Sequence, residues 1–218
     1  MAGYQTLMTN PEVLLQNNKI WAKNREKTSP GYFSRLSEQQ TPEFMWIGCS
    51  DSRVPANEIV GLESGRVFVH RNVGNQVNHT DLNCLSGVQY AVDVLCVQHI
   101  IVTGHYDCGA VGAALTSQHF GVVDNWIRGI RDNYVSRKDE FEGMSELEIT
   151  ERMSELNVIR QVENLSHTRI VQHAWEEGRP LSIHGWIYRL NNGLLKDLNV
   201  SRSCPEDIDP VHRLVPHL

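Results

Sequence analysis

Two apolar runs in this chain are each followed by side chains that can bind a metal ion. Residues 44–48 precede Cys49-Ser50-Asp51-Ser52-Arg53, and residues 99–103 precede Gly104-His105-Tyr106-Asp107-Cys108. Short runs of bulky apolar residues are typical of buried strands. In open α/β sheets, ligands bind where strands end and loops begin. The pattern therefore predicts one site that is built at the ends of two strands.

The composition is that of a soluble globular protein, with 40% hydrophobic and 21% charged residues. A chain of 218 residues is long enough for one domain with a substantial core. We expect a single domain over residues 1–218, in which residues 1–30 form an N-terminal helical arm. The net charge of −6, without a basic tract, argues against nucleic-acid partners. We expect no membrane partner either, because no apolar run is long enough to span a bilayer.

The cysteines and the N-terminus predict a cellular compartment. The first ten residues lack the basic and then apolar pattern of a signal peptide. The five cysteines are odd in number and unevenly spaced: Cys49, Cys84, Cys96, Cys108 and Cys204. This pattern is typical of reduced thiols, so we expect a cytoplasmic protein.

Helical and strand patterns alternate along the chain. Asn10-Pro11-Glu12 predicts the start of a helix that runs to about Lys27 and is apolar on one face. Further helices are predicted from Thr80-Asp81, over 109–115 and over most of 146–177. Strands are predicted over 44–48, 66–70, 99–103, 181–188 and 194–200, with 70–74 leading into a loop.

The connections between these elements predict the sheet. Short links between helices and strands favour parallel pairing. The turn Asn191-Asn192-Gly193 brings the last strand back antiparallel. The predicted fold class is α/β: a mainly parallel five-stranded sheet with an antiparallel last strand, flanked by helices, with an N-terminal helical arm.

Cys49, His105 and Cys108 form a plausible zinc site. Thiolate and imidazole suit Zn²⁺, and three protein ligands leave a fourth position for water, as in catalytic sites. The alternative is that each cysteine is a small buried apolar residue. We assign that role to Cys84 and Cys96, which fall on a helix with a buried pattern. The strand-end positions favour the metal site for Cys49 and Cys108.

Asp51 and Arg53 have two interpretations, and spacing alone does not separate them. They could form a surface ion pair, which contributes little. Alternatively, the Arg53 guanidinium could hold the Asp51 carboxylate so that it accepts a hydrogen bond from zinc-bound hydroxide. If Arg53 released it, Asp51 could itself become the fourth zinc ligand in a closed state.

These residues strongly resemble the two signatures of the β-class carbonic anhydrases, Cys-x-Asp-x-Arg and His-x-x-Cys. The resemblance extends from the N-terminal helix to the strand that ends at Tyr188. It implies a homodimer or homotetramer that hydrates carbon dioxide reversibly to bicarbonate and a proton. It also implies that Zn²⁺ is bound by Cys49, His105 and Cys108, and that Asp51 and Arg53 are the catalytic dyad.

The resemblance further implies a substrate pocket and a regulatory site. Family positions that line the pocket correspond to Gln40, Phe68, Val73 and Tyr90. A non-catalytic bicarbonate site of a regulated, bacterial-type subgroup corresponds to Trp46, Arg71 and Tyr188. This match predicts closure of the zinc site that depends on pH and bicarbonate. The chain departs from many relatives at Ala110, where a second glycine is common, and we expect little effect.

Two other functions remain open from the sequence. The same zinc site could hydrolyse carbon disulfide or carbonyl sulfide. The chain could also be a non-catalytic protein that binds zinc or bicarbonate. The complete Asp51–Arg53 pair argues against the second alternative, because a structural metal site has no use for an open position.

Overall fold

The computed structural model describes residues 10–38 and 40–214, which divide into two compact units, one before and one after the bond between Gln40 and Thr41. The single domain predicted over residues 1–218 and the arm over 1–30 stay predictions. Among the described residues, no helix is long and apolar enough to cross a membrane. The cytoplasmic location also stays a prediction.

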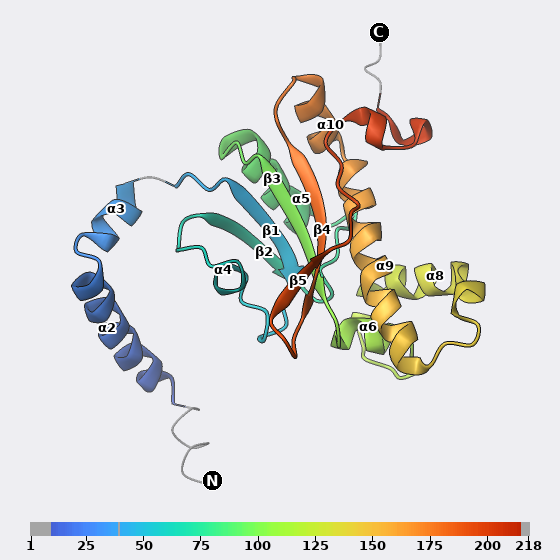
Figure 1. Ribbon diagram of the computed structural model, residues 1–218, viewed down its shortest axis with the longest axis horizontal. Helices are drawn as coiled ribbons and strands as arrows, with labels where there is room; N and C mark the ends of the chain where they lie inside the picture. Colours follow the sequence, from blue (N-terminus) through green and yellow to red (C-terminus); the bar gives the residue numbers. More distant parts are fainter. Residues whose placement is uncertain (1–9, 39, 215–218) are drawn as a thin grey trace. The chain divides into compact units, whose positions relative to one another are not determined.

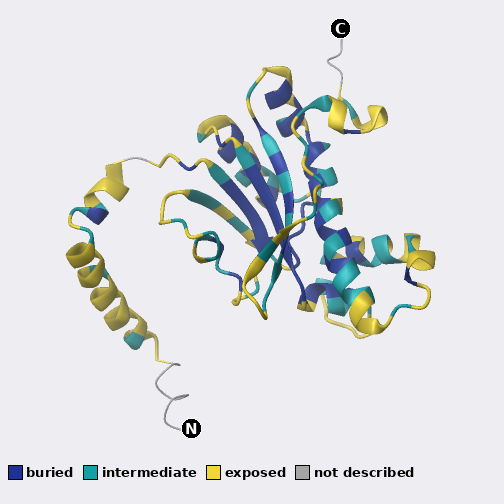
Figure 2. Ribbon diagram, viewed as in Figure 1, coloured by how far each residue is buried: buried dark blue, intermediate teal, exposed yellow. Residues whose placement is uncertain are grey.

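The first unit consists of two helices, α2 (Pro11–Thr28) and α3 (Tyr32–Glu38). Helix α2 begins where the sequence predicts, because the Asn10 side chain accepts a hydrogen bond from the Glu12 N–H at 2.9 Å. None of its residues is buried, as the exposed colour along this helix in Figure 2 shows. The exposed side chains include the large apolar residues Leu14, Leu15, Ile20 and Trp21.

The second unit contains a five-stranded sheet in the order β2-β1-β3-β4-β5 (Figure 1). The strands are β1 (Phe44–Cys49), β2 (Val67–Asn72), β3 (His99–His105), β4 (Ser182–Arg189) and β5 (Leu194–Asp197). The first four are parallel and β5 pairs antiparallel with β4. This arrangement confirms the predicted fold class. The central strands β1 and β3 are neighbours, so their carboxyl ends lie side by side.

Helices pack against one face of the sheet, and the main apolar core lies between them and the strands. They are α5 (Leu82–Gln89), the π-helical turn η1 (Tyr90–Val94), α9 (Glu146–Ser166) and α10 (Arg169–Glu176). Helix α9 begins with a capping box, in which Ser145 and Glu148 bond each other's backbone N–H groups. The helical structure is interrupted between α9 and α10, and the side chain of Thr168 caps the start of α10.

A smaller apolar cluster lies on the other face of the sheet. Trp46, Val54 and Ile101 are buried there, beside the short helix α4 (Ala56–Ile59). Gly48 has to be small, since a Cβ atom at this position would lie 2.3 Å from the indole nitrogen of Trp46. The two faces therefore differ, with the deeper core on the α9 side.

A third group of helices surrounds the carboxyl ends of β1 and β3. It comprises α6 (Gly109–Ala114), α7 (Val123–Trp126), α8 (Arg128–Ser136) and η2 (Lys138–Phe141). Apolar residues of this group pack with Met153 and Leu156 of α9 around Cys49 and Cys108. Two short 3-10 turns, η3 (Pro205–Asp207) and η4 (Pro210–His212), follow the sheet.

Two sequence interpretations were wrong in detail. Strand β2 continues to Asn72 instead of ending at His70, because Arg71 and Asn72 pair with Gly48 and Cys49 of β1. Cys96 is exposed and lies after the helix, with a left-handed backbone at φ 53°, so it is not a buried apolar residue. Cys84 is fully buried, as predicted.

Candidate active site

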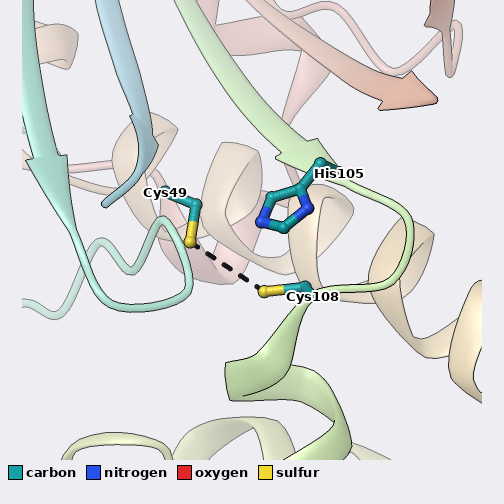
Figure 3. A group of neighbouring side chains, drawn as sticks. All are labelled: Cys49, His105 and Cys108. Carbon is teal, nitrogen blue, oxygen red and sulfur yellow. Dashed lines mark hydrogen bonds between the residues drawn. The ribbon is translucent and has the colours of Figure 1, made fainter. Parts of the chain in front are cut away.

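The ends of the two central strands bring the three predicted metal ligands together. Cys49 is the last residue of β1, His105 is the last residue of β3, and Cys108 is the N-cap of α6. Figure 3 shows the three side chains converging from these elements. Their ligand atoms lie within 4.8 Å of one another, and all three residues are buried. The strand-end prediction therefore identified residues that share one site.

The spacing of the sulfur atoms suits a tetrahedral metal ion. The two Sγ atoms lie 4.0 Å apart. With Zn–S bonds of about 2.3 Å, a tetrahedral ion would hold two sulfurs about 3.8 Å apart. All five cysteines, which lie within the described residues, are free thiols. The site can therefore accept a metal with little movement of its sulfurs.

His105 presents one ring nitrogen to this site. Its Nδ1 lies 3.0 Å from the Tyr106 carbonyl oxygen and donates a hydrogen bond to it, which leaves Nε2 without a proton. Nε2 is buried and has no hydrogen-bond partner among the described residues. A buried polar atom without a partner is costly unless an ion or water meets it. The donor set and this nitrogen fit a zinc ion.

The two thiols have opposite proton affinities. A hydrogen bond from Cys108 lowers the pKa of the Cys49 thiol against the effect of burial. The same contact, with burial, raises the pKa of Cys108. Burial lowers the pKa of His105, but the nearby Cys49 sulfur, the Tyr106 carbonyl oxygen and the Asp51 charge together outweigh it, and the net shift is upward. The cluster thus favours one thiolate beside a thiol, and a divalent cation would favour loss of the second proton.

Asp51 and Arg53 form a bidentate pair beside the cluster. Arg53 Nε lies 3.0 Å from Asp51 Oδ1, and Nη2 lies 2.8 Å from Oδ2. The guanidinium holds the pKa of the Asp51 carboxyl well below its usual range. Asp51 Oδ2 is 3.7 Å from Nε2 of His105, so the carboxylate lies next to the nitrogen that would bind the metal.

Trp46, Arg71 and Tyr188 share one face of the sheet. Trp46 and Tyr188 belong to the same apolar cluster, and Arg71 aligns with Gly48, two residues along the strand from Trp46. Arg71 Nε donates to the Cys49 carbonyl oxygen at 2.9 Å, and its Nη2 donates to the Asp51 carbonyl oxygen. This arginine therefore contacts the backbone at Cys49 and Asp51, a link that sequence spacing did not reveal.

The structure brings part of the predicted substrate pocket together. The rings of Phe68 and Tyr90 lie 5.9 Å apart. Val73 is half exposed and precedes Gly74, whose backbone contributes to the lowered pKa of the Cys49 thiol. Gln40 is exposed and belongs to the first unit. Ala110 is buried at the start of α6, where it would lie 3.0 Å from a Cβ atom at position 74.

Sequence reasoning missed a second group of ligand-type side chains, His70, Asp81 and Cys84, within 4.8 Å of one another. Asp81 caps α5 by accepting a hydrogen bond from the Asn83 N–H at 3.0 Å. His70 Nε2 lies 3.4 Å from the amide nitrogen of Asn72 and accepts from it, so the other nitrogen carries the proton. Asp81 and His70 therefore each have a hydrogen bond within the fold, at the start of α5 and at the end of β2.

Comparisons with known proteins agree with the fold. The family model described as carbonic anhydrase matches residues 44–195. A carbonic anhydrase of Emericella nidulans is 45% identical over 188 residues, which cover 86% of this chain and 82% of that protein. A carbonic anhydrase of Pseudomonas aeruginosa is 35% identical over 77% of this chain and 78% of that protein.

Solved structures give the same result. A Coccomyxa β-carbonic anhydrase in complex with acetazolamide superposes with a TM-score of 0.87 and 40% identity, covering 91% of this chain and 90% of that one. A tetrameric β-carbonic anhydrase of Sordaria macrospora gives 0.85 and 34%, covering 88% and 98%. The mainly parallel sheet and its strand-end Cys–His–Cys cluster are the features of a metalloenzyme. The chain belongs to the β-class carbonic anhydrase family.

Proposed function

We propose that this enzyme catalyses the reversible hydration of carbon dioxide to bicarbonate and a proton, with zinc bound by Cys49, His105 and Cys108. The observation that carries the proposal is the buried Nε2 of His105, which lacks a hydrogen-bond partner among residues 10–38 and 40–214 and lies beside two thiols 4.0 Å apart. Two sulfurs and one nitrogen select zinc over the oxygen-binding cations. Zinc bound there would supply a Lewis-acidic fourth position, at which the pKa of water falls to about 7.

Asp51 would orient the attacking water. Its carboxylate lies 3.7 Å from His105 Nε2 and stays ionised because Arg53 holds both of its oxygens. An ionised carboxylate can only accept hydrogen bonds, so it would fix the direction of the water's O–H and leave a lone pair for carbon dioxide. Arg53 would act by keeping Asp51 in this place.

The pocket residues would serve an apolar substrate. Phe68, Val73 and Tyr90 offer apolar surface to carbon dioxide, and the amide of Gln40 can donate to an oxygen of substrate or product. The assignment rests on the family pattern and on the contact between Phe68 and Tyr90.

We also propose bicarbonate regulation of the type found in a bacterial subgroup of the family. Trp46, Arg71 and Tyr188 would bind a non-catalytic bicarbonate, and the shared sheet face of these side chains supports this. Bicarbonate would compete with the Cys49 and Asp51 carbonyl oxygens for Arg71. Without its hydrogen bonds to Arg71, the segment from Cys49 to Arg53 could change conformation. Asp51 could then separate from Arg53 and become the fourth zinc ligand. Bicarbonate can drive this change only if it binds the closed state better.

A homodimer or homotetramer is the proposed assembly. Helix α2 exposes apolar side chains, with Leu14 63%, Leu15 66% and Ile20 59% exposed, and such a patch is typical of an interface. The Sordaria macrospora relative is described as tetrameric. A second chain that covers α2 would remove this apolar surface from water.

Stopped-flow measurement of carbon dioxide hydration tests the activity. Wild type should hydrate carbon dioxide, and Asp51→Asn should be much slower with its metal retained. A wild type that does not hydrate carbon dioxide but hydrolyses carbon disulfide or carbonyl sulfide would favour the alternative hydrolase. A wild type that binds zinc without any of these activities would favour a non-catalytic binding protein.

A further inference from the structure

Asp107 has an unusual backbone in the loop between β3 and α6. It lies between His105 and Cys108, on the loop that joins their strand and helix in Figure 3. Its φ of 58° is in the left-handed region, which residues other than glycine adopt uncommonly. Strained backbone persists where the surrounding structure or the function requires it. A glycine would adopt this conformation more easily, so the carboxylate needs an explanation.

The Asp107 carboxylate faces Arg53. Its Oδ2 lies 3.5 Å from Arg53 Nη1, and its carbonyl oxygen accepts a hydrogen bond from Nη2 at 3.4 Å. The guanidinium uses Nε and Nη2 for Asp51. It therefore presents one edge to Asp51 and the adjacent edge, Nη1 and Nη2, to Asp107. A planar guanidinium that is held at two edges cannot turn in its plane without losing one partner.

Exposure indicates what this contact can do. The side chains of Arg53 and Asp107 are 52% and 85% exposed, so their ion pair contributes little to the stability of the fold. A weak contact can still set the orientation of a flexible side chain. Its removal should leave folding and the metal unaffected, which makes any change in activity informative. The contrary interpretation is a solvated ion pair without any role.

We propose that Asp107 is a positioning residue, which holds the Arg53 guanidinium in the orientation that grips both oxygens of Asp51. The proposal rests on the proposed role of the Asp51–Arg53 pair in the reaction. Without the Asp107 carboxylate, Arg53 would spend less time hydrogen-bonded to both oxygens of Asp51. Asp51 would then orient the water less well. Because the contact is exposed, salt would weaken it in wild type.

The test uses zinc-loaded Asp107→Asn and Asp107→Gly in stopped-flow carbon dioxide hydration at ionic strengths from about 0.01 M to about 0.5 M. Both should lose about two- to fivefold in kcat, as expected for an exposed pair, and should lose the salt dependence that we expect of wild type. Metal content should be unchanged. Asp107→Glu should restore part of kcat. Asp139→Asn, which removes the same charge from an exposed position elsewhere, should behave as wild type.

A double-mutant cycle separates positioning from a general loop effect. If Asp107 acts through Arg53, then Asp107→Asn should cost nothing further in an Arg53→Lys background. The proposal is overturned if Asp107→Asn keeps wild-type kcat and salt dependence, or if its loss is fully additive with that of Arg53→Lys. A fully active Arg53→Lys would refute the role of the Asp51–Arg53 pair itself, and Asp107 positioning with it.

Discussion

Arg53 bonds both carboxylate oxygens of Asp51, through Nε at 3.0 Å and Nη2 at 2.8 Å. The sequence alone left this pair undecided between a surface contact and a functional one. The Arg53 side chain is half exposed, whereas that of Asp51 is 16% exposed and lies 3.7 Å from the buried nitrogen of His105. The position of Asp51 beside the metal cluster therefore favours the functional interpretation.

Arg53→Lys tests this relationship. Lysine keeps the positive charge but cannot bond two carboxylate oxygens in a fixed plane. We expect kcat to fall by about 10²-fold, as for other losses of alignment near a reacting group, with zinc retained. Stopped-flow hydration and metal analysis of the same sample measure both quantities. Wild-type kcat in this variant would show that the two-point contact between Arg53 and Asp51 is not needed for the reaction.

Cys108→Ser and Cys49→Ser test the metal site. Wild type should contain about one zinc per chain, and each variant should lose most of it, because serine is a poor ligand for this ion. Metal analysis after dialysis measures the content. Cys96→Ser, an exposed cysteine outside the cluster, is the control and should keep the metal. Full zinc content in both ligand variants would refute the assignment.

Tyr188→Phe and Trp46→Phe test the bicarbonate site. If bicarbonate closes the zinc site, wild-type activity should fall steeply below mildly alkaline pH, and added bicarbonate should inhibit more than product competition allows. Either variant should weaken this inhibition while keeping zinc. The measurement is carbon dioxide hydration against pH with and without bicarbonate. A shallow one-proton profile in wild type that bicarbonate does not move would mean that the three residues belong to the core.

Removal of the residues before Thr28 tests the role of α2. We expect weaker association and more exposed apolar surface, since a partner chain would no longer cover this helix. Sedimentation at micromolar concentration compares this variant with wild type. Leu147→Ser changes an equally exposed leucine outside α2 and should leave the assembly intact. A monomeric wild type would contradict the proposal.

His167 should make stability depend on pH. Its ring stacks on that of His212 at 3.9 Å, and burial, followed by the charge of His212, lowers the pKa of His167 to about 4. In the unfolded chain the pKa is about 6.5, so between these values the unfolded state binds a proton that the folded state rejects. The contribution of neutral His167 to the free energy of unfolding is thus present above about pH 6.5 and is lost as the pH falls toward about 4.

The measurement is the melting temperature of wild type and His167→Gln between about pH 7 and 4. The variant should lose less melting temperature over this range, because glutamine does not take up a proton. His119→Gln removes a histidine whose side chain is 86% exposed and should follow wild type. Identical curves for His167→Gln and wild type would show that His167 does not contribute.

The sequence by itself determined the mainly parallel sheet and brought Cys49, His105 and Cys108 together as a candidate metal site. Short apolar runs, each followed by ligand side chains, predicted β1 and β3, and the ends of neighbouring parallel strands have to lie at one edge of the sheet. Cys49, His105 and Cys108 could therefore be found from local patterns. The antiparallel β5 followed in the same way from the turn at 191–193. These features depend on residues that are close in the chain or on strand order.

The tertiary structure decided the contacts that join separate elements. Strand β2 extends to Asn72 because pairing with β1 overrides the loop character of its last residues, and this places Arg71 against the carbonyl oxygens of Cys49 and Asp51. Asp107, whose backbone is left-handed, approaches Arg53, and this contact joins the loop after β3 to the loop after β1. Such side-chain geometry arises from packing between distant segments, which periodicity and spacing do not encode.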